Sequence, residues 1–155
     1  MPKIGIVGNG TDKFTERGAE LAREVILFLL ESENWDAMVS GHSPVGGIDI
    51  WAEEAAIALG IPLDLKIPEV NQWNPPGRYG YKARNLDIAN HSDEVHVIVA
   101  DVYPQEYRGR RFEVCYHHRN GEGAPFVTPT NHVKSGGCWT GKQSASAAWN
   151  IVSNY

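Results

Sequence analysis

The sequence predicts an α/β fold: a Rossmann-like three-layer domain on a parallel sheet, with a Cys/His-rich insertion. Short β-rich runs alternate with stretches of helical periodicity along residues 3–101, which is typical of βαβ units. Glycine-rich turns follow the first two of these runs. The rhythm then breaks over residues 102–137, where aromatics, histidines, glycines and prolines replace the periodicity. At 155 residues the chain corresponds to one domain, so we expect a single domain over 1–155.

The alternation assigns each element up to residue 101. "KIGIVG" is a short β-rich run that ends in glycine, and the helix after it carries Leu21, Val25, Phe28 and Leu29 at helical spacing. A second helix should start after a glycine pair and stop at Gly60. The expected strands are 3–8, 35–41, 61–67 and 93–101, and the expected helices are 16–32, 48–60 and 81–92.

The last fifteen residues, "GKQSASAAWNIVSNY", are rich in small side chains and are predicted to form a helix. No apolar run follows them, so the sheet is expected to end with the strand at 93–101. A loop as long as 102–137 inside a compact domain is usually functional or has an organisation of its own.

Composition excludes several classes of function. A net charge of −5 and a pI of about 5.6 argue against a broad nucleic-acid surface. Arg108, Arg110 and Arg111 form a local basic cluster, which we interpret as solvated loop charge. The N-terminus lacks the pattern of a targeting signal, and the longest apolar run, 25–30, is too short to span a membrane. With two cysteines only, we expect a reduced cytoplasmic protein.

Three glycine loops are candidates for binding an anionic ligand. Ligands of parallel α/β sheets bind where the carboxyl ends of strands meet loops and helix N-termini, and glycine lets the backbone approach a phosphate. None of the loops matches a dinucleotide fingerprint or a P-loop, and βα turns commonly need glycine for their geometry alone. The candidate residues are Gly8, Gly10 and Thr11 in the first loop, Gly41, Gly46 and Gly47 in the second, and Gly136, Gly137 and Thr140 in the third.

Taken together, "VSGHSPVGGIDIWAEEAAIALGIP", "KARNLDIANHSDEVHVIVAD" and the late "SGGCWT" resemble the SLOG superfamily. This Rossmann-like group includes the lonely-guy phosphoribohydrolases, the DNA-processing protein A domain and the small YpsA-like proteins, and the chain is most similar to the last. The resemblance implies a nucleotide or nucleotide-derived ligand, and a homodimer or higher oligomer.

The resemblance also implies binding roles for individual residues. It puts Gly8 under the ligand, makes Asp49 part of a pocket with the second glycine loop, and matches Arg84 and Asn85 to the family's Arg-Asn pair. The alternatives are a surface arginine at 84 and a first-turn carboxylate at 49 that the helix dipole favours. Asp101, at the end of a predicted strand, either binds a ribose hydroxyl or is an ordinary turn residue.

A hydrolase or transferase acting on a nucleoside-type substrate is the alternative function. The family's phosphoribohydrolase motif is Gly-Gly-x-Gly-Thr-x-x-Glu, but here Trp139 replaces a glycine and Gln143 replaces the glutamate. Glutamine cannot exchange a proton near neutral pH, so binding is favoured over catalysis, and Trp139 would stack on a base or fill space. Glu53 and Glu54 remain possible catalytic carboxylates, but they fall on a predicted helix, where solvated glutamates are common. A single-stranded nucleic-acid module is disfavoured by the acidic balance.

Cysteines and histidines crowd the end of the insertion and predict a zinc site. Two residues separate Cys115 from His118, thirteen follow, and five separate His132 from Cys138. Thiolate and imidazole ligands suit tetrahedral zinc, and four protein ligands would make the site structural. We therefore expect one zinc to organise residues 102–137. His117 in place of His118, two buried free thiols, or a Cys115–Cys138 disulfide are the alternatives.

Overall fold

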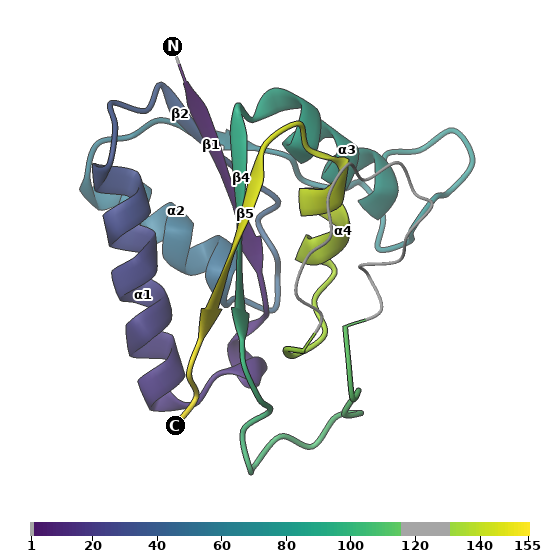
Figure 1. Cartoon of the computed structure of the whole chain (residues 1–155). Helices are drawn as coiled ribbons and strands as arrows, with labels where there is room; N and C mark the ends of the chain where they lie inside the picture. Colours follow the sequence, from purple (N-terminus) through teal and green to yellow (C-terminus); the bar gives the residue numbers. More distant parts are fainter. Residues whose placement is uncertain (1, 116–130) are drawn as a thin grey trace.

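The structure, a computed structural model, describes residues 2–115 and 131–155. Its elements follow the predicted alternation of strands and helices and are labelled in Figure 1. In chain order they are β1 (Lys3–Gly8), the 3₁₀ helix η1 (Thr11–Lys13), α1 (Glu16–Glu31), β2 (Ala37–Ser40), α2 (Ile48–Ala58), β3 (Leu63–Leu65), α3 (Tyr81–His91), β4 (Glu94–Ala100), α4 (Gly137–Gln143) and β5 (Ala147–Val152).

The strands form one parallel sheet in the order β3-β2-β1-β4-β5. Helices α1 and α2 cover one face and α3 and α4 the other, so the predicted three-layer α/β architecture is confirmed (Figure 1). The central strands are apolar on both faces, as a sheet covered on both sides requires. Ile4 and Ile6 of β1 pack towards α1 and α2, whereas Val7 packs with Val97 of β4 and Ile88 of α3.

The end of the chain differs from the expected helix over 141–155. Helix α4 begins earlier, at Gly137, and Ala147–Val152 form a fifth strand that pairs in parallel with β4, from Val95↔Ala147 to Ala100↔Val152. The prediction that the sheet ends at β4 is therefore wrong. Small residues suggested a helix, but a serine turn at 144–146 interrupts it, and the residues after the turn meet the open edge of β4.

The C-terminus is fixed to the strand ends through Asn154, which is 1% exposed. Its amide nitrogen donates to the carbonyl oxygens of Lys13 and Val102, and its side-chain oxygen accepts from the N–H of Thr15, the N-cap residue of α1. One amide thus links η1, α1, β4 and β5. Within residues 2–115 and 131–155, no helix has the length and apolar character required to cross a lipid bilayer.

Candidate ligand-binding crevice and metal cluster

A crevice opens at the carboxyl ends of β1 and β4. From β1 the chain builds β2 and β3 on one side and then returns to build β4 and β5 on the other, so this is the switch point at which open α/β sheets bind ligands. Two cavities of about 170 and 230 Å³ lie here, and Gly8 and Gly136 line both of them. Because they share these walls, the two cavities are neighbours on either side of the contact between the first and third glycine loops.

The smaller one, the Asp49–Arg84 cavity, gathers many of the residues predicted from sequence. The lining residues come from β1, the loop after β2, the start of α2, helix α3, and α4 with the residue before it. Its lining consists of Val7, Gly8, Ser43, Asp49, Arg84, Asn85, Ile88, Gly136, Gly137 and Thr140.

Arg84 is held in a fixed orientation beside this cavity. Its Nη1 donates to the Gly41 carbonyl oxygen at 2.8 Å, its Nε donates to Asn85 Oδ1 at 2.6 Å, and its guanidinium carbon lies 5.2 Å from the centre of the Tyr81 ring. Burial lowers the pKa of Arg84, and the neighbouring Asp49 opposes that shift. A Cβ at Gly41 would come within 2.6 Å of Nη1, so glycine at this position permits the close approach of the arginine.

Asp49 faces the cavity from the first turn of α2 and is only partly exposed. Desolvation raises its pKa from 3.8 to about 6, although Arg84 and the Ser43 N–H, which donates to Oδ2 at 3.2 Å, lower it and Glu53 raises it further. The carboxyl group therefore changes its protonation state close to neutral pH and can either accept or donate a hydrogen bond to a ligand hydroxyl.

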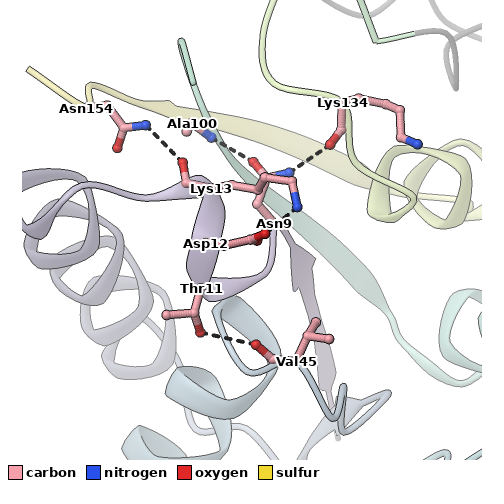
Figure 2. A network of polar contacts seen from close by, with 8 residues as sticks. All are labelled: Asn9, Thr11, Asp12, Lys13, Val45, Ala100, Lys134 and Asn154. Carbon is pink, nitrogen blue, oxygen red and sulfur yellow. Dashed lines mark hydrogen bonds and ion pairs between the residues drawn. The ribbon is translucent and has the colours of Figure 1, made fainter. Parts of the chain in front are cut away.

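The remaining residues of the first two glycine loops shape the crevice wall without lining this cavity. Gly46 and Gly47 have φ angles of 75° and 77°, and the backbone of Gly47 packs so closely on Asn9 and Gly10 that a side chain would collide with them. Thr11 Oγ1 donates to the Val45 carbonyl oxygen at 3.3 Å, which joins the two loops (Figure 2).

At the third glycine loop, two of the backbone N–H groups that could have bound an anion are already engaged. The Gly137 N–H donates to Ser135 Oγ at 3.1 Å, and the Trp139 N–H donates to the Gly136 carbonyl oxygen at 3.1 Å. The Trp139 ring also points elsewhere, because it packs edge-on against Trp73 with 4.9 Å between ring centres and lines a different cavity. The Gly137 and Trp139 N–H groups are therefore engaged within the segment itself, while Gly136 lines both cavities.

Asp101 is used as a turn residue. Its Oδ1 accepts hydrogen bonds from the N–H groups of Val102 at 2.8 Å and Asn154 at 2.9 Å, and its side chain lines neither cavity of the crevice. The carboxylate thus joins the ends of β4 and β5.

The larger cavity contains side chains that were not singled out as ligands from the sequence. It is lined by Gly8, Asn9, Gly10, Lys13, Tyr103, Tyr107, Arg110, Phe112, Lys134, Ser135 and Gly136. We call it the cationic cavity after Lys13, Arg110 and Lys134. Arg110 was interpreted as solvated loop charge, and Lys13 and Lys134 carry no motif. Their only sequence signal is that Lys13 follows the first glycine loop and Lys134 precedes the third.

Three of the four predicted metal ligands are buried side chains that lie close together. The ligand atoms of Cys115, His132 and Cys138 all lie within 4.8 Å of one another, with 3.7 Å between Cys138 Sγ and His132 Nε2. Neither cysteine forms a disulfide. His118 and His117 fall outside the described residues, so the predicted fourth ligand stays a prediction. The three described residues form a cluster that could hold a metal ion.

Hydrogen bonds around this cluster suit a thiolate-bound cation. His132 Nδ1 lies 2.8 Å from the Val133 carbonyl oxygen, which can only accept, so the proton sits on Nδ1 and the Nε2 lone pair faces the sulfurs. Trp149 Nε1 donates to Cys138 Sγ at 3.4 Å, and the Ser135 N–H donates to Cys115 Sγ at 3.5 Å. Without a cation, hydrogen bonding with Cys115 and burial raise the pKa of Cys138, and a bound dication would reverse that direction.

A second polar network is formed by Glu53, which lies on α2 like Asp49, with Ser40 and His42. Glu53 is buried, its Oε2 accepts from Ser40 Oγ at 2.9 Å, and its Oε1 lies 2.6 Å from His42 Nδ1. His42 has a φ of 52°, which is uncommon outside glycine and is often associated with functional sites. Of the two glutamates noted from sequence, Glu53 therefore orients an imidazole, whereas Glu54 is exposed.

The fold and site define a class: a Rossmann-like α/β domain with a polar crevice at its switch point and a Cys/His cluster in the adjoining segment. No family model, curated protein or solved structure matches this chain.

Proposed function

We propose that the protein binds a nucleotide or nucleotide-derived metabolite in the crevice between β1 and β4. The observation that carries the proposal is the pair of adjoining cavities, about 170 and 230 Å³, on either side of Gly8 and Gly136. Each is smaller than a typical small-molecule pocket of roughly 300–1,000 Å³, and together they reach that range. One ligand of nucleotide size that occupies both fits this arrangement.

The chemistry of the Asp49–Arg84 cavity supports a sugar-bearing ligand. A carboxyl group whose pKa is about 6 can bond to a hydroxyl as acceptor or donor, and the planar guanidinium of Arg84 offers donors to an anionic or carbonyl oxygen. The resemblance to the SLOG superfamily, in which the Arg-Asn pair belongs to the ligand site, agrees with this assignment. The oligomer implied by the same resemblance, and a cytoplasmic location, remain predictions.

Titration calorimetry with AMP, GMP, CMP and UMP tests the proposal. We expect at least one to bind, and Arg84→Ala to weaken its binding about 10-fold or more, because a hydrogen bond to a charged group contributes about 1.5–3 kcal/mol. Arg78→Ala removes an exposed arginine that lines neither cavity and serves as the control. Failure of all four nucleotides to bind, or equal binding by Arg84→Ala, would contradict the proposal.

We further propose that Cys115, His132 and Cys138, with His118 as the fourth ligand, hold one structural zinc. Support comes from the burial of the three sulfur and nitrogen ligand atoms and from the N–H groups that donate to both sulfurs. Four protein ligands leave no position for a catalytic water. Elemental analysis should find about one zinc per chain, and a value below a tenth would refute the site.

Hydrolysis or transfer of a nucleoside-type substrate is the second candidate, and the His42–Glu53 pair favours it. A buried carboxylate bonded to Nδ1 orients an imidazole so that Nε2 can accept a proton from water. Incubation with the nucleotide that binds, followed by chromatography for free base and phosphate, separates the candidates. If product forms, His42→Gln should abolish it while binding persists; absence of product leaves binding as the function.

A further inference from the structure

The cationic cavity differs in charge from the protein as a whole. Its lining contains Lys13, Arg110 and Lys134, and no carboxylate stands among the described residues that line it. The chain as a whole carries a net charge of −5. Asp12 offsets part of this positive charge through its 2.9 Å contact with Lys13, although the Asp12 side chain is itself 66% exposed. A concave site with one sign of charge concentrates ligands of the opposite sign.

The three cations come from separate segments, each of which is fixed by hydrogen bonds. Asn9 is 4% exposed; its Nδ2 donates to the Lys134 carbonyl oxygen at 3.0 Å and its Oδ1 accepts from the Ala100 N–H at 3.0 Å (Figure 2). The Lys13 carbonyl oxygen accepts from Asn154 at 2.9 Å (Figure 2). The backbone positions of Lys13 and Lys134 are therefore set by the same amides that hold the ends of β1, β4 and β5.

The segment that carries Arg110 has its own anchor. Arg111 Nη2 donates to the carbonyl oxygens of Pro104 at 2.9 Å and Gln105 at 3.1 Å, which folds the segment back on itself. Of the three arginines that the sequence groups together, Arg111 thus serves the loop, Arg108 is exposed and Arg110 lines the cavity.

Aromatic rings pack against the three cationic heads, and the Asp12 carboxylate also contacts Lys13. The Phe112 ring has the Arg110 guanidinium 4.7 Å and the Lys134 ammonium 4.6 Å from its centre, and the Tyr107 ring lies 5.1 Å from Lys13 Nζ. A contact with a ring face positions a cation without neutralising its charge. These contacts orient the three cationic heads that line the cavity.

We propose that the cationic cavity binds the phosphoryl group of the ligand, while the sugar lies on the Asp49–Arg84 side of Gly8 and Gly136. This inference rests on the proposed nucleotide binding and assigns the orientation of the ligand. The turn at Gly136–Thr140, where the sequence suggested the phosphate, has its Gly137 and Trp139 N–H groups engaged within the turn. In this proposal, Lys13, Arg110 and Lys134 bind the phosphoryl group through charge-assisted hydrogen bonds.

The inference predicts which part of a ligand each substitution affects. On the full chain, we measure binding of AMP, adenosine and inorganic phosphate by titration calorimetry, using Lys134→Met and Arg110→Met. Each variant should bind AMP about tenfold more weakly, as expected for the loss of one charge-assisted hydrogen bond, and adenosine with unchanged affinity. Arg108→Met, which removes an exposed cation from the same loop, should bind all probes as the unchanged protein does.

Arg110 is exposed, so its replacement tests the cavity even if Lys134→Met is unstable. Equal losses for AMP and adenosine in Arg110→Met, or no loss for AMP, would overturn the phosphoryl site. If Arg84→Ala still weakens nucleotide binding in that case, the proposed function stands and only the orientation fails. If no nucleotide binds but inorganic phosphate binds in an Arg110-dependent manner, the phosphoryl site stands and the nucleotide proposal fails.

Discussion

Asp49→Asn should stabilise the protein near neutral pH and remove part of its pH dependence. The pKa of Asp49 is raised from 3.8 to about 6, because burial disfavours the charged carboxylate more than Arg84 and the Ser43 N–H favour it. A raised carboxyl pKa means that this group contributes stability below pH 4, and that the contribution is lost as pH rises through 6. Two pKa units at 1.36 kcal/mol each correspond to about 3 kcal/mol, and partial exposure of the residue reduces this to between about 1 and 3 kcal/mol.

Urea unfolding of both proteins at several pH values between 4 and 8 measures this effect. The free energy of unfolding of Asp49→Asn minus that of the unchanged protein should be small at pH 4 and rise by about 1–3 kcal/mol by pH 7.5, since titrations of groups that do not interact with Asp49 cancel in the difference. Asparagine keeps an oxygen for the Ser43 N–H, so that contact is preserved. A difference that stays constant across this range would refute the desolvation argument. The same variant should bind AMP more weakly, which would make Asp49 a residue kept for function at a cost in stability.

Three other substitutions test the fold, the crevice wall and the metal cluster. Asn154→Ala should lower the free energy of unfolding by about 2–4 kcal/mol in urea titrations, because it leaves three partly buried backbone groups, of Lys13, Thr15 and Val102, unpaired. A loss below about 0.5 kcal/mol would contradict this role. Gly41→Ala should displace Arg84, so its main effect should be weaker AMP binding in calorimetry and not a lower melting temperature. Unaltered binding would show that the close approach is not required. Cys138→Ser should reduce the zinc content and melting temperature together, and retention of both would exclude this residue as a ligand.

The sequence predicted the fold class and the strands up to β4 because those signals are local. Alternating apolar runs and glycine turns depend on neighbouring residues, and the parallel sheet follows from their order. The fifth strand was missed because the small residues before and at its start suggested a helix, although Trp149, Ile151 and Val152 suit a strand. Its partner, β4, is more than forty residues away in the chain. The strand expected at 61–67 is shorter for a similar reason: only Leu63–Leu65 find a partner, in β2.

The site was predicted in part, for reasons that concern side-chain geometry. Residues at a strand end or in the first turn of a helix, such as Gly8 and Asp49, are placed by the fold itself. Where the turn's N–H groups point is not a sequence property, because the hydroxyl of Ser135 takes the Gly137 donor. The packing of Trp139 against Trp73 could not be predicted from the sequence either, since it depends on a loop more than sixty residues earlier. The cationic cavity was missed because its cations come from three segments that share no motif.

The metal cluster and the crevice are joined through one short segment, and this connection explains why both features meet in the sequence at 132–138. His132 and Cys138 stand at its two ends, and Lys134 and Gly136 between them line the cationic cavity. Ser135 links the metal cluster to the crevice directly, because its N–H donates to Cys115 Sγ while its hydroxyl accepts from the Gly137 N–H. A cation that fixes both sulfurs would therefore fix Ser135, and with it the wall that both cavities share. In this arrangement a bound metal would act on the proposed ligand binding through the position of the backbone, without touching the ligand.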